Sequence, residues 1–126
     1  MTKPESHRDL IVWQKAMDLT IEIYRLAARF PRDETYRLVN QITRAAASVP
    51  ANIAEGRGRG GRKDFANFLA IAKGSLMETE TFLILTIRLG YVDQKEADSA
   101  LDLITEISKM LTRLRRRLLE AAVEQS

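Results

Sequence analysis

The chain has 126 residues, no cysteine, and 20 basic against 17 acidic residues, for a formal net charge of +3. This length fits one domain with a single core, and the lack of cysteine excludes disulfides and thiolate metal sites. The first residues lack the apolar core of a signal peptide, and no run of about 18 apolar residues occurs. We therefore expect a soluble, cytoplasmic protein.

The first predicted helix, residues 9–30, carries two apolar stripes about 140° apart on its surface. One stripe consists of Leu10, Trp13, Met17, Ile21, Tyr24 and Ala28. The other consists of Val12, Ala16, Leu19, Ile23, Leu26 and Phe30. A helix with two such stripes needs two different partners. One stripe would face the core, and we predict that the stripe from Val12 to Phe30 forms an interface between copies of the chain.

A second helix is expected after Pro31, which stops the first, with Asp33 available as a cap. Pro50 falls inside its apolar pattern. A continuous helix kinked near Pro50 is favoured, because the apolar side keeps its phase across the proline. The alternative ends this helix at Ser48 and begins a new one there.

The stretch 56–63, Gly-Arg-Gly-Arg-Gly-Gly-Arg-Lys, contains the spacing G-x-G-x-x-G and four positive charges. A dinucleotide fingerprint requires a preceding strand, and a P-loop requires Ser or Thr where Asp64 stands, so both are rejected. Two interpretations remain. The stretch is a flexible helix connection whose glycines permit positive φ, which we favour, or a mobile loop whose arginines contact phosphates.

The third predicted helix, residues 64–89, is apolar almost all round and belongs at the centre. Gly74 in its interior costs about 1 kcal/mol of helix propensity, which a close approach by another backbone would explain. Glu78 and Glu80 are expected either to pair with Arg37 or Arg44 or to reach solvent. We predict that a kink, a close contact and buried polar pairs fix how helices two and three pack, and that these are supplied by Pro50, Asn52, Glu55, Gly74, Glu78 and Glu80. Ser48 and Gly56 belong to the same structural motif.

Gly90 closes the third helix, and Asp93 is expected to cap the fourth. The polar face of this last helix begins acidic and ends basic. That order complements the helix dipole, so a solvated face is the simpler interpretation and a cationic patch for RNA or DNA the alternative. The short links predict an all-α, antiparallel up-and-down four-helix bundle formed by residues 1–126, with 1–8 and 120–126 frayed.

The chain resembles the four-helix-bundle proteins of the 23S rRNA intervening-sequence protein family over residues 9–118. The most specific segment is Ser48-Val49-Pro50-Ala51-Asn52-Ile53-Ala54-Glu55-Gly56. Further matches are Asp9-Leu10, Val12-Trp13-Gln14, Gln41-Ile42, Arg44-Ala45-Ala46, Phe65, Phe68-Leu69, Ile71-Ala72, Gly74-Ser75, Glu78, Glu80-Thr81 and Leu89-Gly90-Tyr91.

This resemblance implies a bacterial homopentamer in which bundles pack side by side into a barrel, with no defined activity. The fold is also similar to that of the accessory protein of diversity-generating retroelements, a basic pentameric barrel. That protein associates with nucleic acid and a reverse transcriptase, so RNA, DNA or a reverse transcriptase are the partners that the resemblance implies.

An enzymatic role is not favoured by the residue types present. His7 is the one histidine of the chain, so neither a Ser-His pair nor the Glu-x-x-His motifs of a di-iron bundle can be built. A carboxylate metal site of Glu55, Glu78 and Glu80 is not favoured either, because arginines are available as counterions. We expect no cofactor, no metal and no small-molecule substrate.

The prediction is therefore a non-enzymatic oligomeric scaffold that binds nucleic acid, or an enzyme that acts on nucleic acid. The residues predicted to make the contacts are Arg44, Arg57, Arg59, Arg62, Lys63, Arg113, Arg116 and Arg117. The alternative is a purely structural or protein-interaction module whose arginines pair with carboxylates of the same chain.

Overall fold

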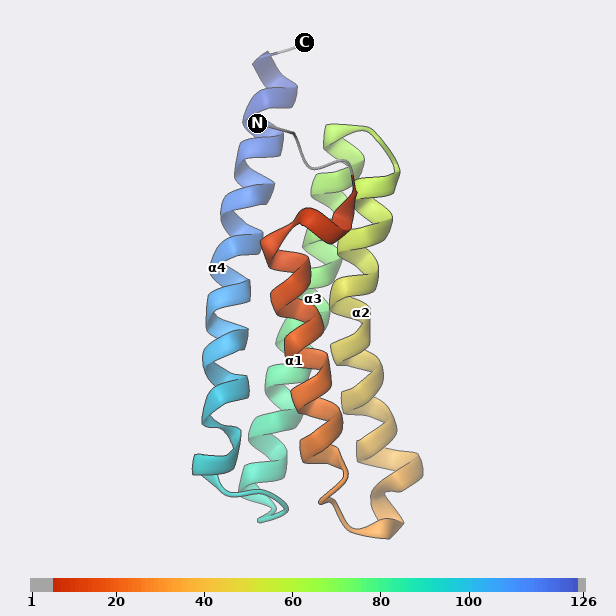
Figure 1. Ribbon diagram of the computed structural model, residues 1–126, viewed down its shortest axis with the longest axis vertical. Coiled ribbons are helices and arrows are strands. Elements are labelled where there is room, and N and C mark those ends of the chain that lie inside the picture. Colours follow the sequence, from red (N-terminus) through yellow and green to blue (C-terminus); the bar gives the residue numbers. More distant parts are fainter. Residues whose placement is uncertain (1–5, 125–126) are drawn as a thin grey trace.

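The structure, a computed structural model, describes residues 6–124. It contains four α-helices, α1 (Ile11–Ala27), α2 (Asn40–Gly58), α3 (Arg62–Arg88) and α4 (Gln94–Glu124). Figure 1 shows them side by side, with the chain running down α1, up α2, down α3 and up α4. No strand occurs within residues 6–124, which confirms the prediction of an all-α four-helix bundle. None of the helices described is both long enough and apolar enough to span a membrane.

The core is formed by one apolar stripe from each helix. In α1 and just beyond it, this stripe is Val12, Ala16, Leu19, Ile23, Leu26 and Phe30, each of which is at most 9% exposed. These are the six residues predicted to form an interface between copies, so that assignment is wrong. They pack against α2 and α4 of the same chain and share one core with apolar residues of α3, whereas Met17, Ile21 and Tyr24 of the other stripe are exposed. Burial of a large aliphatic side chain contributes about 1.5–3 kcal/mol, so this stripe is a main source of stability.

Helix α2 runs without interruption through Pro50, so the alternative with a break at Ser48 is wrong. Pro50 is buried and has no N–H to donate to the carbonyl of Ala46, four residues earlier. The hydroxyl of Thr20 in α1 lies 3.2 Å from this carbonyl oxygen and supplies a donor. A kink at Pro50 stays a prediction.

The entry into α2 differs from the predicted cap. Asp33 lies in the 3₁₀ turn Arg32–Glu34, and no side chain caps the wider π turn Thr35–Val39 that follows. Glu34 is 7% exposed and pairs with Arg37 in the next turn. Two successive irregular turns therefore replace the predicted cap.

The link between α3 and α4 follows the prediction closely. Gly90 has φ 78°, in the left-handed region, and Tyr91 N donates to Thr86 O at 3.0 Å, which ends the helix. Asp93 Oδ1 accepts from Glu96 N at 2.7 Å, and Glu96 Oε1 accepts from Asp93 N at 3.0 Å. This reciprocal capping box fixes the start of α4.

Gly56 and Gly74 have different surroundings. A Cβ on Gly56 would lie 2.6 Å from Phe68 Cβ, so only glycine allows α2 and α3 to approach this closely. Around Gly74, by contrast, a Cβ would meet nothing within 4 Å. The close contact predicted at Gly74 is therefore wrong within the described residues, and the structure has a close approach of α2 and α3 at Gly56 instead.

Helix α4 extends through Glu124, and fraying of its last residues stays a prediction. At the other terminus, a short 3₁₀ turn, His7–Asp9, precedes α1, with Ser6 accepting a bond from Arg8 N. The rest of the predicted frayed segments, residues 1–5 and 125–126, lies outside the described residues.

Candidate nucleic-acid interface

The C-terminal half of α4 and the link between α2 and α3 lie at the same end of the bundle (Figure 1). They line a common cavity of about 840 Å3, to which the link contributes Gly60 and Gly61, the first turn of α3 contributes Arg62 and Lys63, and α4 contributes Leu118 and Ala122. The two basic segments that the sequence separates by about 50 residues are thus brought together. We refer to Arg62, Lys63, Arg113, Arg116 and Arg117 as the basic end.

Arginines of α4 point to both sides of the helix. Arg113 and Arg117 line a cavity of about 370 Å3 between α4 and the start of α1, where Asp9 is also located. Arg116 lines a groove of about 530 Å3 between α4 and α3. Within the described residues, no member of the basic end forms an ion pair. No carboxylate of the described part of the chain therefore pairs with these cations.

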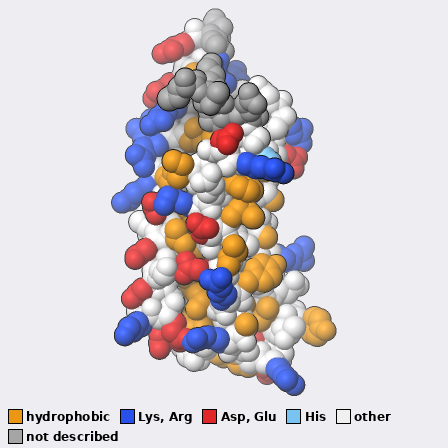
Figure 2. Space-filling model, viewed as in Figure 1, with side chains coloured by type: hydrophobic (Ala, Val, Ile, Leu, Met, Phe, Trp, Pro, Cys, Tyr) orange, Lys and Arg blue, Asp and Glu red, His pale blue; other side chains and the backbone are white. Residues whose placement is uncertain are grey.

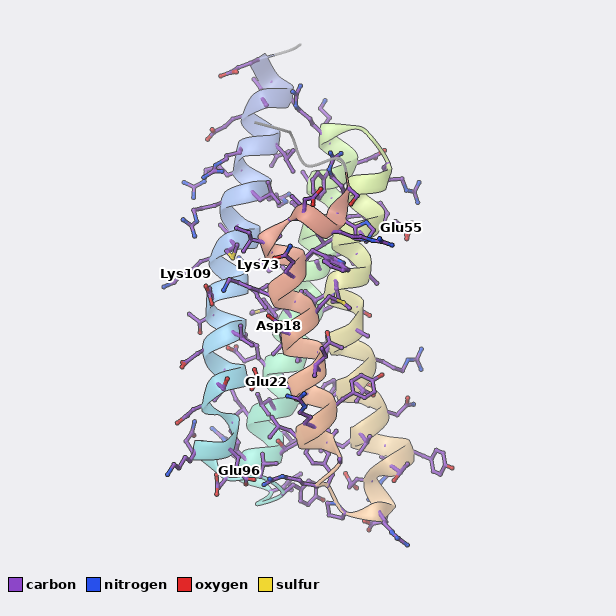
Figure 3. All side chains as sticks on the ribbon, in the orientation of Figure 1. Asp18, Glu22, Glu55, Lys73, Glu96 and Lys109 are labelled. Carbon is purple, nitrogen blue, oxygen red and sulfur yellow. The ribbon has the colours of Figure 1, made fainter. Side chains whose placement is uncertain are left out.

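The first half of α4, which is acidic, forms ion pairs and a hydrogen bond with side chains in and just after α1. Glu106 pairs with Lys15 of α1 at 2.9 Å, Glu96 pairs with Arg29, and Glu22 of α1 accepts from Ser99 at 3.2 Å. Figure 3 shows Glu96 near the lower end of α4 and Lys109 about midway along it. In Figure 2 acidic side chains are frequent on the lower left and basic side chains gather above them, while further basic side chains lie along the lower edge of the molecule. The second half of α4 is therefore more basic than the first, although basic residues are also present at the opposite end of the bundle.

The start of α3 adds a local electrostatic feature. Arg62 and Lys63 occupy its first turn, and the N-cap Gly61 contributes no side-chain hydrogen bond. Cations are unfavourable near the positive end of the helix dipole, and Asp64 offsets them only in part. Uncapped N–H groups beside two cations form an arrangement that binds phosphate readily.

Two predicted contact residues are held by the chain itself. Arg59 donates to Glu55 Oε2 at 2.9 Å, and its guanidinium lies 5.1 Å from the ring centroid of Phe68. Arg57 is half-buried in the last turn of α2 and makes an interaction within the chain. Both lie beside the basic end, but their side chains are already engaged.

Arg44 is not part of the basic end. It lies on α2 in a groove of about 290 Å3 together with Tyr36, Gln41 and Glu78. The entry to α2 is at the opposite end of the bundle from the link between α2 and α3 (Figure 1). The eight predicted contact residues therefore fall into two separate regions.

The carboxylates assigned to packing between α2 and α3 are not buried pairs. Glu78 is exposed, Glu80 is half-buried, and neither forms an ion pair within the described residues. Glu55 is exposed and pairs with Arg59. Asn52 bonds only within its own helix, to Ser48 O at 2.8 Å, and Ser48 donates to Arg44 O. Residues 6–124 contain no group of three or more His, Asp or Glu that could hold a metal ion.

Arg115 and Lys73 were missed by the sequence analysis. Arg115 Nε donates to Ala66 O of α3 at 3.2 Å, and Lys73 Nζ donates to Thr112 Oγ1 of α4 at 2.8 Å. They fasten α4 to α3 beneath the basic end and so position the arginines around them. A run of basic residues from Arg113 to Arg117 did mark this segment, but their spacing alone does not tell which arginine turns inward.

The outward stripe of α1 leaves apolar side chains uncovered. Ile21 is 47% and Tyr24 56% exposed, and Met17 lies one turn before Ile21 on the same face. Beside Tyr24, a shallow cavity of about 290 Å3 separates α1 from α2. Figure 2 shows apolar side chains down the front of the molecule, between its basic and acidic groups. We call Met17, Ile21 and Tyr24 the outer seam. Other large exposed apolar side chains, Ile71, Ile84, Leu85 and Leu89, lie along α3 and its end.

Comparison with known proteins agrees with this architecture. Residues 8–113 match the family model described as 23S rRNA-intervening sequence protein. Among solved structures, the chain is similar to the crystal structure of a protein of unknown function from the S23 ribosomal protein family of Bacteroides thetaiotaomicron. That likeness has 31% identity and a TM-score of 0.77, and it covers 83% of this chain and 98% of the other. No curated protein matches the chain.

Proposed function

The chain belongs to the 23S rRNA-intervening sequence protein family, and we propose that it is a non-enzymatic oligomeric scaffold that binds nucleic acid through the basic end. The observation that carries this proposal is that Arg62 and Lys63 of α3 lie at the same end of the bundle as Arg113, Arg116 and Arg117 of α4, and that none of the five forms an ion pair within the described residues. Phosphates of a nucleic-acid backbone are the ligand that such a surface fits, because their binding is mainly electrostatic.

The charge distribution supports the proposal over a purely structural role. In a structural module the arginines would pair with carboxylates of the same chain, as Lys15 and Arg29 do with Glu106 and Glu96. Within residues 6–124 the arginines of the basic end form no such pair, although acidic residues lie on the same helix. Their charges are available to a partner.

An oligomer is supported by the outer seam rather than by the stripe that forms the core. Contiguous exposed apolar side chains on a soluble bundle indicate a contact surface, because water is excluded from them when they are covered. A second copy of the chain is the proposed partner. The homopentamer implied by the family resemblance would place several basic ends on one assembly, which raises the avidity for a long nucleic acid.

The test is a titration of fluorescently labelled single-stranded RNA and duplex DNA with the assembled protein at several salt concentrations. We expect binding at low salt that weakens steeply as the salt concentration rises, with a log–log slope of about −0.7 per phosphate contact for a single strand. A well-assembled protein that binds neither probe at low salt would overturn the proposal and leave the protein-interaction module as the better description.

A further inference from the structure

We propose that the groove around Tyr36, Arg44 and Glu78 binds an unpaired guanine base of a single-stranded nucleic acid. This inference rests on the proposed function, which it extends from phosphate contacts to base recognition. The groove lies between α2 and α3 and has a volume of about 290 Å3. That is at the lower limit of the roughly 300–1,000 Å3 typical of pockets for drug-sized ligands, so a single base is a suitable occupant.

Tyr36 is the most exposed large apolar side chain of the described chain, with 91% of its surface accessible. It belongs to the π turn before α2, a wide turn of a kind often found at functional sites. The buried Glu34 pairs with Arg37 in the same turn. This pair fixes the backbone on either side of Tyr36, so the ring is presented to solvent by an ordered turn. An exposed aromatic ring next to a groove is a platform on which a base can stack.

The polar groups of the groove supply both kinds of hydrogen-bonding partner. Asn40, Gln41 and Arg44 carry donors, and the Glu78 carboxylate from α3 carries acceptors. Within the described residues, none of these four side chains makes a hydrogen bond or an ion pair. Arg44 and Glu78 line the same groove but are not bonded to each other, so both remain available to a ligand placed between them.

Guanine matches this pair of groups better than the other bases do. Its N1–H and N2–H groups are adjacent donors for the two oxygens of a carboxylate. Its O6 and N7 atoms are adjacent acceptors for the two donors of a guanidinium. Adenine and cytosine lack the paired donors, and uracil has a single ring N–H between two carbonyls. Glu78 and Arg44 would therefore read the two edges of a guanine that stacks on Tyr36.

The experiment compares short single-stranded RNAs of equal length that differ at one base within a run of uracils. The full-length assembled protein is titrated with each RNA, and binding is followed by fluorescence anisotropy. We expect the guanine RNA to bind at least about 5-fold more tightly than the adenine RNA. Tyr36→Ala should weaken binding of the guanine RNA by roughly 5- to 150-fold, whereas Tyr36→Phe should retain it.

Glu78→Gln separates base recognition from general electrostatics. It should abolish the preference and bring the guanine and adenine RNAs to within about 2-fold of each other. The matched control Asp102→Asn removes the same charge on α4 and should leave the preference intact. If Glu78→Gln instead strengthens binding of all RNAs equally, the carboxylate acts only by repulsion and the inference fails.

The two proposals fail in different ways. RNA binding that depends on salt, shows no base preference and is insensitive to Tyr36→Ala would overturn the guanine site while keeping the scaffold function. Absence of binding to every RNA at low salt would overturn both.

Discussion

The hydroxyl of Thr20 in α1 lies 3.2 Å from the carbonyl oxygen of Ala46 in α2, the carbonyl that Pro50 leaves without a helical donor. The same hydroxyl lies 2.8 Å from Ala16 O in its own helix. A buried carbonyl without a donor costs about 1–3 kcal/mol, so a proline in the middle of a helix is tolerated best where a neighbour replaces the missing N–H. Thr20 does this and also joins α1 to α2.

Replacing Thr20 by valine should destabilise the protein by about 1 kcal/mol, because the carbonyl of Ala46 loses its donor. In a Pro50→Ala background the backbone N–H of residue 50 can bond to that carbonyl, so Thr20→Val should cost less. A double-mutant cycle from urea unfolding should give a coupling of at least about 0.5 kcal/mol. Equal costs in both backgrounds would show that the hydroxyl does not compensate for the proline.

Gly56→Ala should destabilise the protein by about 1–3 kcal/mol, because a Cβ at this position would lie 2.6 Å from Phe68 Cβ and force α2 away from α3. Gly58→Ala is the matched control in the same helix. A Cβ on Gly58 meets nothing within 4 Å, so this change should be neutral or stabilise by up to about 1 kcal/mol. Thermal unfolding of the two variants measures the difference, and similar effects would argue against the close approach.

Ile21→Glu should dissociate the proposed oligomer without unfolding the chain. Ile21 is 47% exposed, so the new carboxylate is solvated in the free chain, but it would be buried without a partner in the assembly. Sedimentation velocity should show a shift to a smaller species, while circular dichroism stays helical. Thr105→Glu on the exposed side of α4 is the control and should keep the assembly. A wild-type chain that sediments as a monomer at micromolar concentration would refute the interface.

Removing cations from the basic end should lower the salt dependence of nucleic-acid binding. The double variant Arg62→Ala, Lys63→Ala should reduce the magnitude of the log–log salt slope by about 1.4 for a single strand, or about 0.7 for each lost phosphate contact. Arg88→Ala removes a charge from the last turn of α3, far from the basic end, and should leave the slope unchanged. A change in slope from Arg88→Ala half as large as that from the double variant would show that only the net charge matters, because it removes one charge and the double variant removes two.

The helices and several of their ends could be predicted because the signals are local. Gly90 and Asp93 stop and start helices through bonds to residues within a few positions of themselves. Apolar periodicity likewise marked all four helices. The close approach at Gly56 was not predicted, because the aromatic neighbours that require glycine come from α3 and are not evident from its position alone.

The choice between the two stripes of α1 could not be made from sequence. Both follow the same spacing, and only the placement of α2 and α4 beside Thr20 and Lys15 decides which stripe turns inward. The groove around Tyr36 was missed for a related reason. A single tyrosine in an irregular turn has no periodicity, and its nearness to Glu78 arises from two helices whose facing residues lie about 40 positions apart.

The pairing of Lys15 with Glu106, and of Arg29 with Glu96, joins the first helix to the last. All other neighbouring helices are also neighbours in sequence. The contact between α1 and α4 therefore closes the longest loop in the chain and has the largest entropic cost of closure. Hydrogen exchange should therefore report earlier opening of α1 than of α2 or α3. A released α1 exposes its core stripe, which fits the vacated groove of another copy equally well. The contact between α1 and α4 is thus the place where domain swapping between copies of this bundle is easiest.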